Sequence, residues 1–322
     1  MPVPMEQEGR VATLTIDNPP RHFQDRALIF ELDALLRRIE RDRSIGAVVL
    51  TGAHPRSFLT HYDVAEILAG AKITPDLPEA AFAAALRMAG AIERLPGGER
   101  LLRHPRTAGL VTLRRNQAVY VRMNRMDKVF IAAINGTAAA GGCELALACD
   151  IRLMADGDFT IGLTEPVLGF NPGGGGGQRL ARNVGAARAV EMLLEARHYS
   201  PREAVEAGLV HRAVAPERLL EEAKETAARL ARRSPRAVRA SKRAVYQGPS
   251  TRWPGGFRLD QAGFAWGAVA PSTGRAMQAM LDEMETLPEG VPSPWHDPER
   301  LRAWQEGTAV DFVGEPAAAR PA

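Results

Sequence analysis

The sequence predicts an α/β fold with a helical region at its C-terminal end. Short apolar runs that are typical of buried strands alternate with segments of helical periodicity up to about residue 215. From Pro216 onward helical periodicity dominates. The 322 residues suffice for one large domain with an appendage or for two domains, and no internal repeat is visible.

The first part of the chain contains two predicted strands separated by a helix. Residues 11–17 alternate apolar and polar side chains, which indicates a half-buried strand that ends at Asn18. Residues 28–39 place leucine and isoleucine at helical spacing, which predicts an amphipathic helix. The continuous apolar run at residues 47–50 suits a strand that is covered on both faces.

The rest of the chain continues this alternation beyond an irregular stretch. Residues 70–125 hold a helical piece at 80–94 and a loop-like stretch at 96–98. Further along we predict strands at 129–134, 151–154 and 209–214, and helices at 141–148, from about 178, at 186–195, 219–232 and 236–246. The tail from residue 288 has the composition of a partly disordered segment, although Trp295 and Trp304 favour packing of some of it.

Composition and charge narrow the functional class. The net charge of +3 comes from basic residues spread along the chain, which argues against nucleic-acid binding and suits an anionic small molecule or a plain soluble surface. No apolar run approaches the roughly 20 residues that cross a bilayer, and no secretory signal pattern is visible. We therefore expect no membrane partner and a cytoplasmic location. The only two cysteines, Cys143 and Cys149, do not suggest a disulfide framework.

Three segments carry residues suited to catalysis: residues 57–64, 135–150 and 162–180. In the second segment, Gly141 and Gly142 open a predicted helix, whose first N–H groups are unpaired and carry about half a positive charge. Glycine there lets a ligand oxygen approach the backbone, which stabilises negative charge as it develops. Glu144 lies about one helical turn further on, and Glu165 lies on a separate loop, so both carboxylates can flank one ligand.

The order and spacing of these segments resemble the crotonase (enoyl-CoA hydratase/isomerase) superfamily. The resemblance runs from about residue 11 to about residue 280 and includes further blocks at 183–189, 204–210 and 234–238. It implies a crotonase-type spiral of ββα units with a C-terminal helical region that makes trimer contacts. We predict a core at 1–215 with an insertion at about 70–125, a helical region at 216–287 and a Pro-rich tail at 288–322.

By this resemblance, the backbone N–H groups of Tyr62 and Gly141 form an oxyanion hole for a thioester carbonyl. Glu144 takes a proton from the water that attacks the β-carbon, Glu165 delivers a proton to the α-carbon, and the N–H of Gly173 helps to place the water. The leading prediction is an enoyl-CoA hydratase-like lyase. The alternatives are an enoyl-CoA isomerase, a decarboxylase or a thioester hydrolase of the same superfamily, or a non-catalytic acyl-CoA-binding protein.

The resemblance also implies how the substrate is carried and how the chain assembles. Coenzyme A would arrive as part of the substrate, with no tightly bound cofactor, and the protein would form a homotrimer or a dimer of trimers. The residues that match the family's CoA and substrate contacts lie after the first two strands: Arg21, His22, Phe23, Phe58, Thr60, His61, Asp63 and Val64. A solvated surface arginine is an equally good interpretation of Arg21.

Plainer interpretations stand beside several of these residues. Taken alone, Glu144 would be a salt-bridged helix residue and Glu165 the cap of a turn. The five glycines at 173–177 lack the Gly-Lys-Ser/Thr sequence of a nucleotide-binding loop, so we expect them to serve close backbone packing and water placement. The two cysteines are expected to be small buried side chains. The histidines show no metal-ligand spacing, so no metal site is predicted.

Two departures from the family pattern bear on the substrate. Family members carry small residues where this chain has His61 and Tyr62, which changes the pocket near the oxyanion hole, although the Tyr62 N–H can still donate. The insertion at about 70–125 falls where the family covers the acyl end of the pocket. We therefore expect an enlarged or reshaped acyl site.

Overall fold

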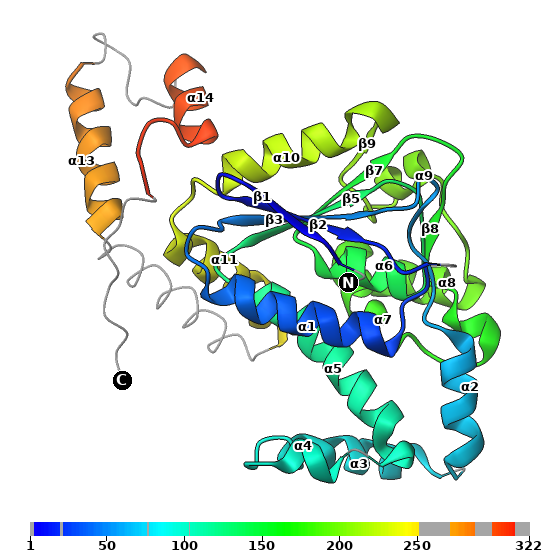
Figure 1. The fold of residues 1–322 in the computed structure, drawn as a ribbon. Coiled ribbons are helices and arrows are strands. Elements are labelled where there is room, and N and C mark those ends of the chain that lie inside the picture. The colour runs from blue at the N-terminus through cyan, green and yellow to red at the C-terminus, as the bar shows by residue number, and fades with distance from the viewer. Residues whose placement is uncertain are drawn as a thin grey trace.

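Two sheets form the centre of the molecule (Figure 1). The computed structural model describes residues 3–19, 22–75, 77–102, 104–250, 271–286 and 298–312. Within them a six-stranded sheet has the order β1-β2-β3-β5-β7-β9, and a three-stranded sheet has the order β4-β6-β8. The strands of the larger sheet are β1 (Met5–Glu8), β2 (Val11–Ile16), β3 (Ala47–Gly52), β5 (Val129–Ile134), β7 (Ile151–Ala155) and β9 (Arg212–Val214). The strands of the smaller sheet are β4 (Ser57–Leu59), β6 (Thr137–Ala139) and β8 (Ile161–Gly162).

The chain visits the two sheets in turn, and this produces the predicted ββα order. A strand of the larger sheet is followed by a strand of the smaller sheet and then by helix, as in β5, β6 and α6 (Gly141–Ala148) and again in β7, β8 and α7 (Gly176–Val184). All strand pairs except β1 with β2 are parallel. Parallel pairing brings the ends of β4 and β6 together, so the loops that follow them meet beside the start of α6.

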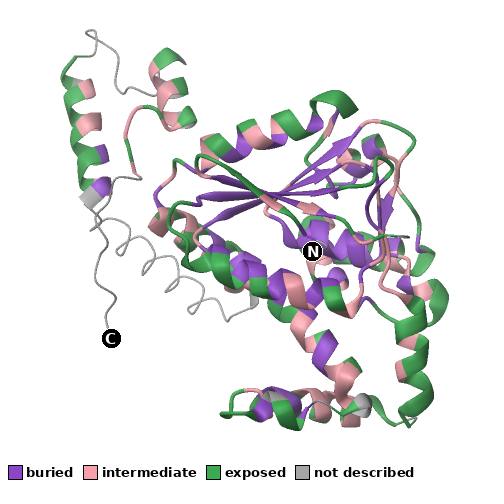
Figure 2. Ribbon diagram, in the orientation of Figure 1, coloured by how far each residue is buried: buried purple, intermediate pink, exposed green. Residues whose placement is uncertain are grey.

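The larger sheet is covered on both faces, which explains the continuous apolar runs of its central strands. Helix α10 (Leu219–Leu230) packs on one face against alternate residues such as Val49 and Ile131. Helix α1 (Arg26–Arg41) and α6 lie on the other face against Val48 and Phe130 (Figure 1). Figure 2 shows the result, because the central strands and the whole of α6 are buried.

The remaining helices surround these layers. Those between β4 and β5 are α2 (Val64–Ile73), α3 (Glu79–Ile92), α4 (Gly98–Leu101) and α5 (Pro105–Arg125). The later ones are η1 (Glu165–Leu168), α8 (Ala186–Glu195), α9 (Pro201–Glu206), η2 (Pro216–Arg218), α11 (Pro235–Gln247), η3 (Gly248–Ser250), α13 (Pro271–Glu285) and α14 (Pro298–Glu306). The predicted insertion therefore falls mostly on helix, and α3 and α4 stand out from the main body (Figure 1).

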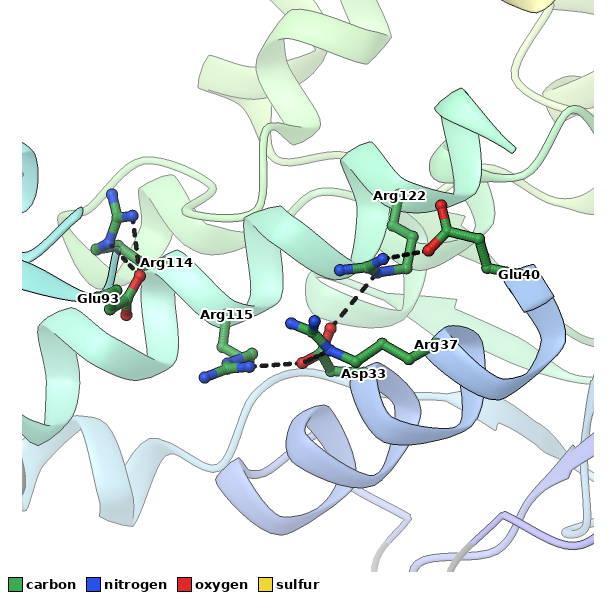
Figure 3. Close-up of polar contacts among 7 residues, drawn as sticks. All are labelled: Asp33, Arg37, Glu40, Glu93, Arg114, Arg115 and Arg122. Carbon is green, nitrogen blue, oxygen red and sulfur yellow. Dashed lines mark hydrogen bonds and ion pairs between the residues drawn. The ribbon is translucent and has the colours of Figure 1, made fainter. Parts of the chain in front are cut away.

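A cluster of ion pairs fixes α5 against α1 (Figure 3). Asp33 of α1 is buried and accepts from Arg37 at 3.0 Å and from Arg115 of α5 at 2.6 Å. Arg122, two helical turns beyond Arg115, bridges to Asp33 at 3.6 Å and to Glu40. Because both arginines lie on the α1 side of α5, these ion pairs set the orientation of α5 relative to α1.

Most sequence predictions for the core are confirmed. The strands expected at 11–17, 47–50, 129–134 and 151–154 are present as β2, β3, β5 and β7. The strand expected at 209–214 begins only at Arg212, because the N–H groups of Leu209 and Val210 both bond to Ala204 O and close a buried turn after α9. The helix expected from about 178 begins earlier, at Gly176.

The C-terminal end agrees in part with the sequence predictions. Trp304 of α14 donates from Nε1 to Glu283 of α13 at 3.0 Å, so this part of the tail packs as expected. Trp295 lies outside the described residues. The division into core, helical region and tail stays a prediction, and so does the trimer.

Candidate active site

The site is built around the start of α6, where β6 ends. Ala140, the residue before the helix, has φ 48° and ψ −115°, a conformation that L-residues rarely adopt. This turn lets α6 begin directly at Gly141 without a side-chain cap. A Cβ on Gly142 would lie 1.8 Å from the carbonyl oxygen of Leu59, so only glycine allows α6 to approach β4 this closely.

Two main-chain N–H groups lie together at this point. The Gly141 N–H is the first of α6 and has no partner within the helix. Gln24 donates to His61 O and accepts from Asp63 N, so the N–H of Tyr62 between them faces away from Gln24's backbone. Neither N–H has a hydrogen-bond acceptor among the residues that the structure describes. A Cβ on Gly141 would lie 3.5 Å from Tyr62 N, which shows how close the two donors are.

Glu144 points from the first turn of α6 into the glycine run. Its Oε1 accepts from Gly174 N and Gly176 N at 2.8 Å each, and Oε2 accepts from Gly174 N at 3.1 Å. The side chain is only 3% exposed. Burial and the negative charge of Glu165 raise the pKa of Glu144 to about 7, against the opposing effect of the two backbone hydrogen bonds and Arg179.

Glu165 approaches from the other side, as the first residue of η1 after β8. It is 8% exposed, and its Oε2 is buried with no hydrogen-bond partner within the described residues. Burial raises the pKa of Glu165 as well. A buried carboxyl oxygen without a partner is costly unless a ligand or a water molecule meets it. The negative charge of Glu165 is one cause of the raised pKa of Glu144.

Comparison with known proteins identifies the family. A family model described as enoyl-CoA hydratase/isomerase matches residues 104–269, more than half of the chain. The chain belongs to the enoyl-CoA hydratase/isomerase family. It is similar to a short-chain-enoyl-CoA hydratase of Clostridium acetobutylicum, with 33% identity over 245 residues, 76% of this chain and 80% of the relative. A crotonyl-CoA hydratase of Syntrophomonas wolfei is 31% identical over 248 residues, 77% of this chain and 82% of the relative.

A solved structure confirms that this family member has the predicted crotonase fold. An enoyl-CoA hydratase from Bacillus anthracis superimposes with a TM-score of 0.70 and 26% sequence identity. The match covers 88% of this chain and 97% of that one. The alternation of strands between two sheets is therefore shared with enzymes of the family.

The unusual His61 and Tyr62 of this hydratase-family chain are both held by contacts of their side chains. The Tyr62 hydroxyl donates to Glu66 on α2, which ties the ring to that helix. His61 stacks on Phe23 with ring centroids 4.1 Å apart, and its Nδ1 lies 2.8 Å from Tyr62 O. The two large side chains thus brace the loop that carries the Tyr62 N–H.

The other residues predicted to contact CoA and substrate fall into two groups. His22 and Thr60 lie beside this loop, where Thr60 Oγ1 donates to His22 O, while Asp63 caps α2 and Val64 begins it. Phe58 is different, because its side chain is buried in the main core and leaves only its backbone for a ligand. Arg21 lies outside the described residues. The binding roles of all of these residues stay predictions.

The glycine run has a use that the sequence analysis missed. The N–H groups that contact Glu144 are those of Gly174 and Gly176, so the run binds the protein's own carboxylate. Arg179 holds the run in place by donating to Gly174 O at 2.9 Å. No contact of the Gly173 N–H bears on its predicted role with water, which stays a prediction. The glycine run is visible in the sequence. Its binding partner, Glu144, lies thirty residues before Gly174, and no sequence pattern connects the two.

A buried polar network behind the site was also missed. Gln24, which is 1% exposed, donates to Tyr120 Oη at 2.9 Å and to Asn116 Oδ1 at 3.3 Å. Asn116 and Tyr120 are one turn apart on the buried face of α5, next to Val119 and Met123. Polar residues on an otherwise apolar helix face were the available clue.

The described residues hold neither a metal cluster nor a spanning segment. They contain no group of three His, Cys, Asp or Glu side chains arranged to bind a metal ion. In the same residues, no helix combines the length and hydrophobicity that a membrane crossing requires. Cys143 and Cys149 are free, buried thiols whose pKa values are raised by burial, as expected for small core side chains.

Proposed function

We propose that this enzyme adds water across the α,β double bond of a 2-enoyl-CoA thioester. The observation that carries the proposal is the combination of two buried carboxyl groups with the adjacent, unbonded N–H groups of Tyr62 and Gly141. Names of similar proteins support it, because the relatives described above are hydratases of short-chain enoyl-CoA and crotonyl-CoA.

In the proposed mechanism, the two N–H groups bind the thioester oxygen and stabilise the enolate that forms there. Each such donor contributes about 3–4 kcal/mol to lowering the barrier in comparable sites. Glu144 accepts a proton from water, whose oxygen bonds to the β-carbon, and the electron pair of the double bond moves onto the thioester as the enolate. Glu165 then gives a proton to the α-carbon, so one water molecule is added in total. Proton exchange with solvent returns Glu144 to its ionised form and Glu165 to its protonated form before the next turnover. Coenzyme A enters and leaves with the acyl group.

The alternatives use fewer of these groups. An enoyl-CoA isomerase moves a proton between two carbons of one substrate, for which one carboxyl group suffices. A decarboxylase or a thioester hydrolase has no need of a carboxyl group at each end of a double bond. A protein that only binds acyl-CoA has no use for a carboxyl group whose pKa is raised to about 7. Hydration is the reaction that employs both Glu144 and Glu165.

A cavity beside the glycine run suits the acyl chain. It has a volume of about 300 Å³ and lies between α5, the run and α8, with Gln117, Asn171, Ala189 and Leu193 among its lining residues. Helix α5 belongs to the predicted insertion, and this position supports the proposal of a reshaped acyl site. We propose that the cavity accepts an acyl group larger than the four carbons of crotonyl-CoA.

The direct test is loss of the ultraviolet absorbance of the conjugated thioester when the enzyme meets a series of 2-enoyl-CoA substrates. We expect turnover, with kcat/KM rising beyond the four-carbon substrate. Binding of every CoA ester without turnover would support the non-catalytic alternative. Turnover that is best with crotonyl-CoA and falls with each added carbon would assign the cavity another purpose.

The rate of hydration should depend on pH through Glu144. Its pKa is raised to about 7, and it must be ionised to accept a proton, so kcat/KM should fall as the pH drops through this value. A kcat/KM that stays constant through the same range would contradict the role of Glu144.

Assembly and location complete the proposal. We propose a homotrimer or a dimer of trimers in the cytoplasm, with an acyl-CoA thioester as substrate and no tightly bound cofactor. The support is the family membership and the helical C-terminal region. Sedimentation velocity of the purified full chain measures the assembly.

A further inference from the structure

We infer that Gln24 is a positioning residue that holds the two oxyanion-binding N–H groups at a fixed spacing. The inference rests on the proposed function, because it concerns how Tyr62 and Gly141 serve the reaction. Among the described residues, Gln24 contacts the segments of both donors and a third element, α5: its backbone binds the Tyr62 segment, and its side chain contacts Gly141 and α5.

The backbone of Gln24 controls the position of Tyr62. It donates to His61 O at 3.0 Å and accepts from Asp63 N at 2.7 Å, so it binds the residues on both sides of Tyr62, whose N–H is the first donor. This isolated parallel bridge leaves the N–H of Tyr62 directed away from the Gln24 backbone. A shift of Gln24 therefore shifts the first donor with it.

The side chain of Gln24 controls the position of Gly141. A Cβ on Gly141 would lie only 2.4 Å from Gln24 Oε1, so the amide packs directly against the Cα atom of the second donor. The same contact explains why this position needs a glycine. The side chain thus acts as a spacer between the loop that holds Tyr62 and the start of α6.

Helix α5 holds the spacer in place. Gln24 Nε2 donates to Tyr120 Oη at 2.9 Å and to Asn116 Oδ1 at 3.3 Å, and the Tyr120 hydroxyl reaches Gly141 O at 3.5 Å. All three side chains are buried, so none of these bonds competes with bulk water. The Asp33 cluster anchors α5 itself to α1. The spacing of the donors is therefore set from outside the loop that carries them.

The consequence for catalysis is specific. A displacement of about 1 Å in a catalytic group can cost on the order of 10²-fold in rate, because stabilisation of a developing charge depends steeply on donor geometry. The ground-state carbonyl carries less charge, so it is less sensitive to the same displacement. Loss of the spacer should therefore lower kcat much more than it raises KM.

The first test is Gln24→Leu, which keeps the bulk of the side chain and removes both ends of its amide. We expect kcat to fall by about 10- to 100-fold while KM changes by less than about threefold. Thr112→Val is the matched control, because Thr112 is also a buried polar residue of α5 but bonds to Ala108 O, outside the site. A Gln24→Leu enzyme with wild-type kcat, or an equal loss in the control, would overturn the inference.

A spectroscopic test measures how well the two N–H groups stabilise an enolate, without requiring turnover. A 3-oxoacyl-CoA loses its α-proton to form an enolate with its own ultraviolet absorbance, and donors at the thioester oxygen increase the enolate fraction. We expect the wild type to raise this fraction at fixed pH and Gln24→Leu to reduce the gain by about tenfold. An undiminished enolate signal in the variant would refute the positioning role. A wild type that neither hydrates enoyl-CoA nor binds the enolate would instead refute the proposed function.

Tyr120→Phe provides a milder variant if Gln24→Leu does not fold. It removes a single oxygen that accepts from Gln24, so the shape of the core is preserved. We expect a smaller fall in kcat and in enolate signal, again with little change in KM. Adding Gln24→Leu to Tyr120→Phe should cost no more than Gln24→Leu alone, because the two act through one contact. Independent, additive losses would contradict the shared pathway.

Discussion

Replacing Glu144 by glutamine should lower kcat for hydration by about 10²- to 10⁴-fold, the usual contribution of a general base. The two 2.8 Å bonds from Gly174 N and Gly176 N both end on Oε1, and a glutamine oxygen can accept them equally well. The glycine run should therefore keep its place while the proton acceptor is lost. Initial rates of absorbance loss with saturating enoyl-CoA measure the effect.

The matched control is Glu93→Gln. Glu93 is a partly buried carboxylate that pairs with Arg114 at 3.0 Å, and Arg114 also donates to Leu86 O of α3, so this pair lies on the α3 side of α5 and is separate from Glu144 and Glu165. We expect its kcat to equal that of the wild type. If Glu144→Gln hydrated its substrate as fast as Glu93→Gln, water would be activated by another group. Unchanged affinity of the variant for the 3-hydroxyacyl-CoA product would show that binding is intact.

Replacing Glu165 by glutamine should be comparably damaging, with kcat lower by about 10²- to 10⁴-fold. Its Oε2 is buried without a partner in the described part of the chain, so the substitution breaks no hydrogen bond of that atom and removes mainly an acid. The proposed task of this residue is proton delivery to the α-carbon. Exchange of the α-proton of the 3-hydroxyacyl-CoA product in heavy water should therefore slow to the same degree as hydration.

The exchange measurement separates the two carboxyl groups. A Glu165→Gln enzyme that exchanges the α-proton at the wild-type rate but no longer hydrates would place Glu165 on the water instead of on the carbon. That outcome would exchange the proposed roles of Glu144 and Glu165 while leaving both in the site. Loss of substrate binding with an unchanged kcat would remove Glu165 from the chemistry altogether.

The parts of the fold that could be predicted from the sequence are the helices and strands whose residue pattern lies within one short segment. The central strands β3 and β5 are continuous apolar runs because both faces are covered, and α1 shows its buried stripe directly. The strands of the smaller sheet have only two or three residues each, which is too short for any periodicity to show. Strand β1 was not predicted for another reason: all but one of its residues are exposed, so it has no buried apolar face.

The active site could likewise be predicted from the sequence only where its residues are close together in the chain. Glu144 and Gly141 share one helix start, so local spacing sufficed to connect them. The partners of Gln24 lie 92 and 96 residues away on α5, and no pattern in a single sequence links such positions. The start of α7 was predicted two residues late because glycine has a low helix propensity. Here the hydrogen bond from Gly176 N to Glu144 outweighs that preference.

The hold of the glycine run on Glu144 has a consequence for how this segment tolerates drift over evolutionary time. The groups that orient the carboxylate belong to the peptide backbone, so selection here acts by excluding side chains and not by choosing them. A Cβ would lie 2.6 Å from Glu144 Oε2 at Gly174, whereas at Gly177 it would make an ordinary 3.4 Å contact with Leu193. The five glycines therefore carry unequal constraint: the second, Gly174, is closed to change and the last, Gly177, is comparatively free.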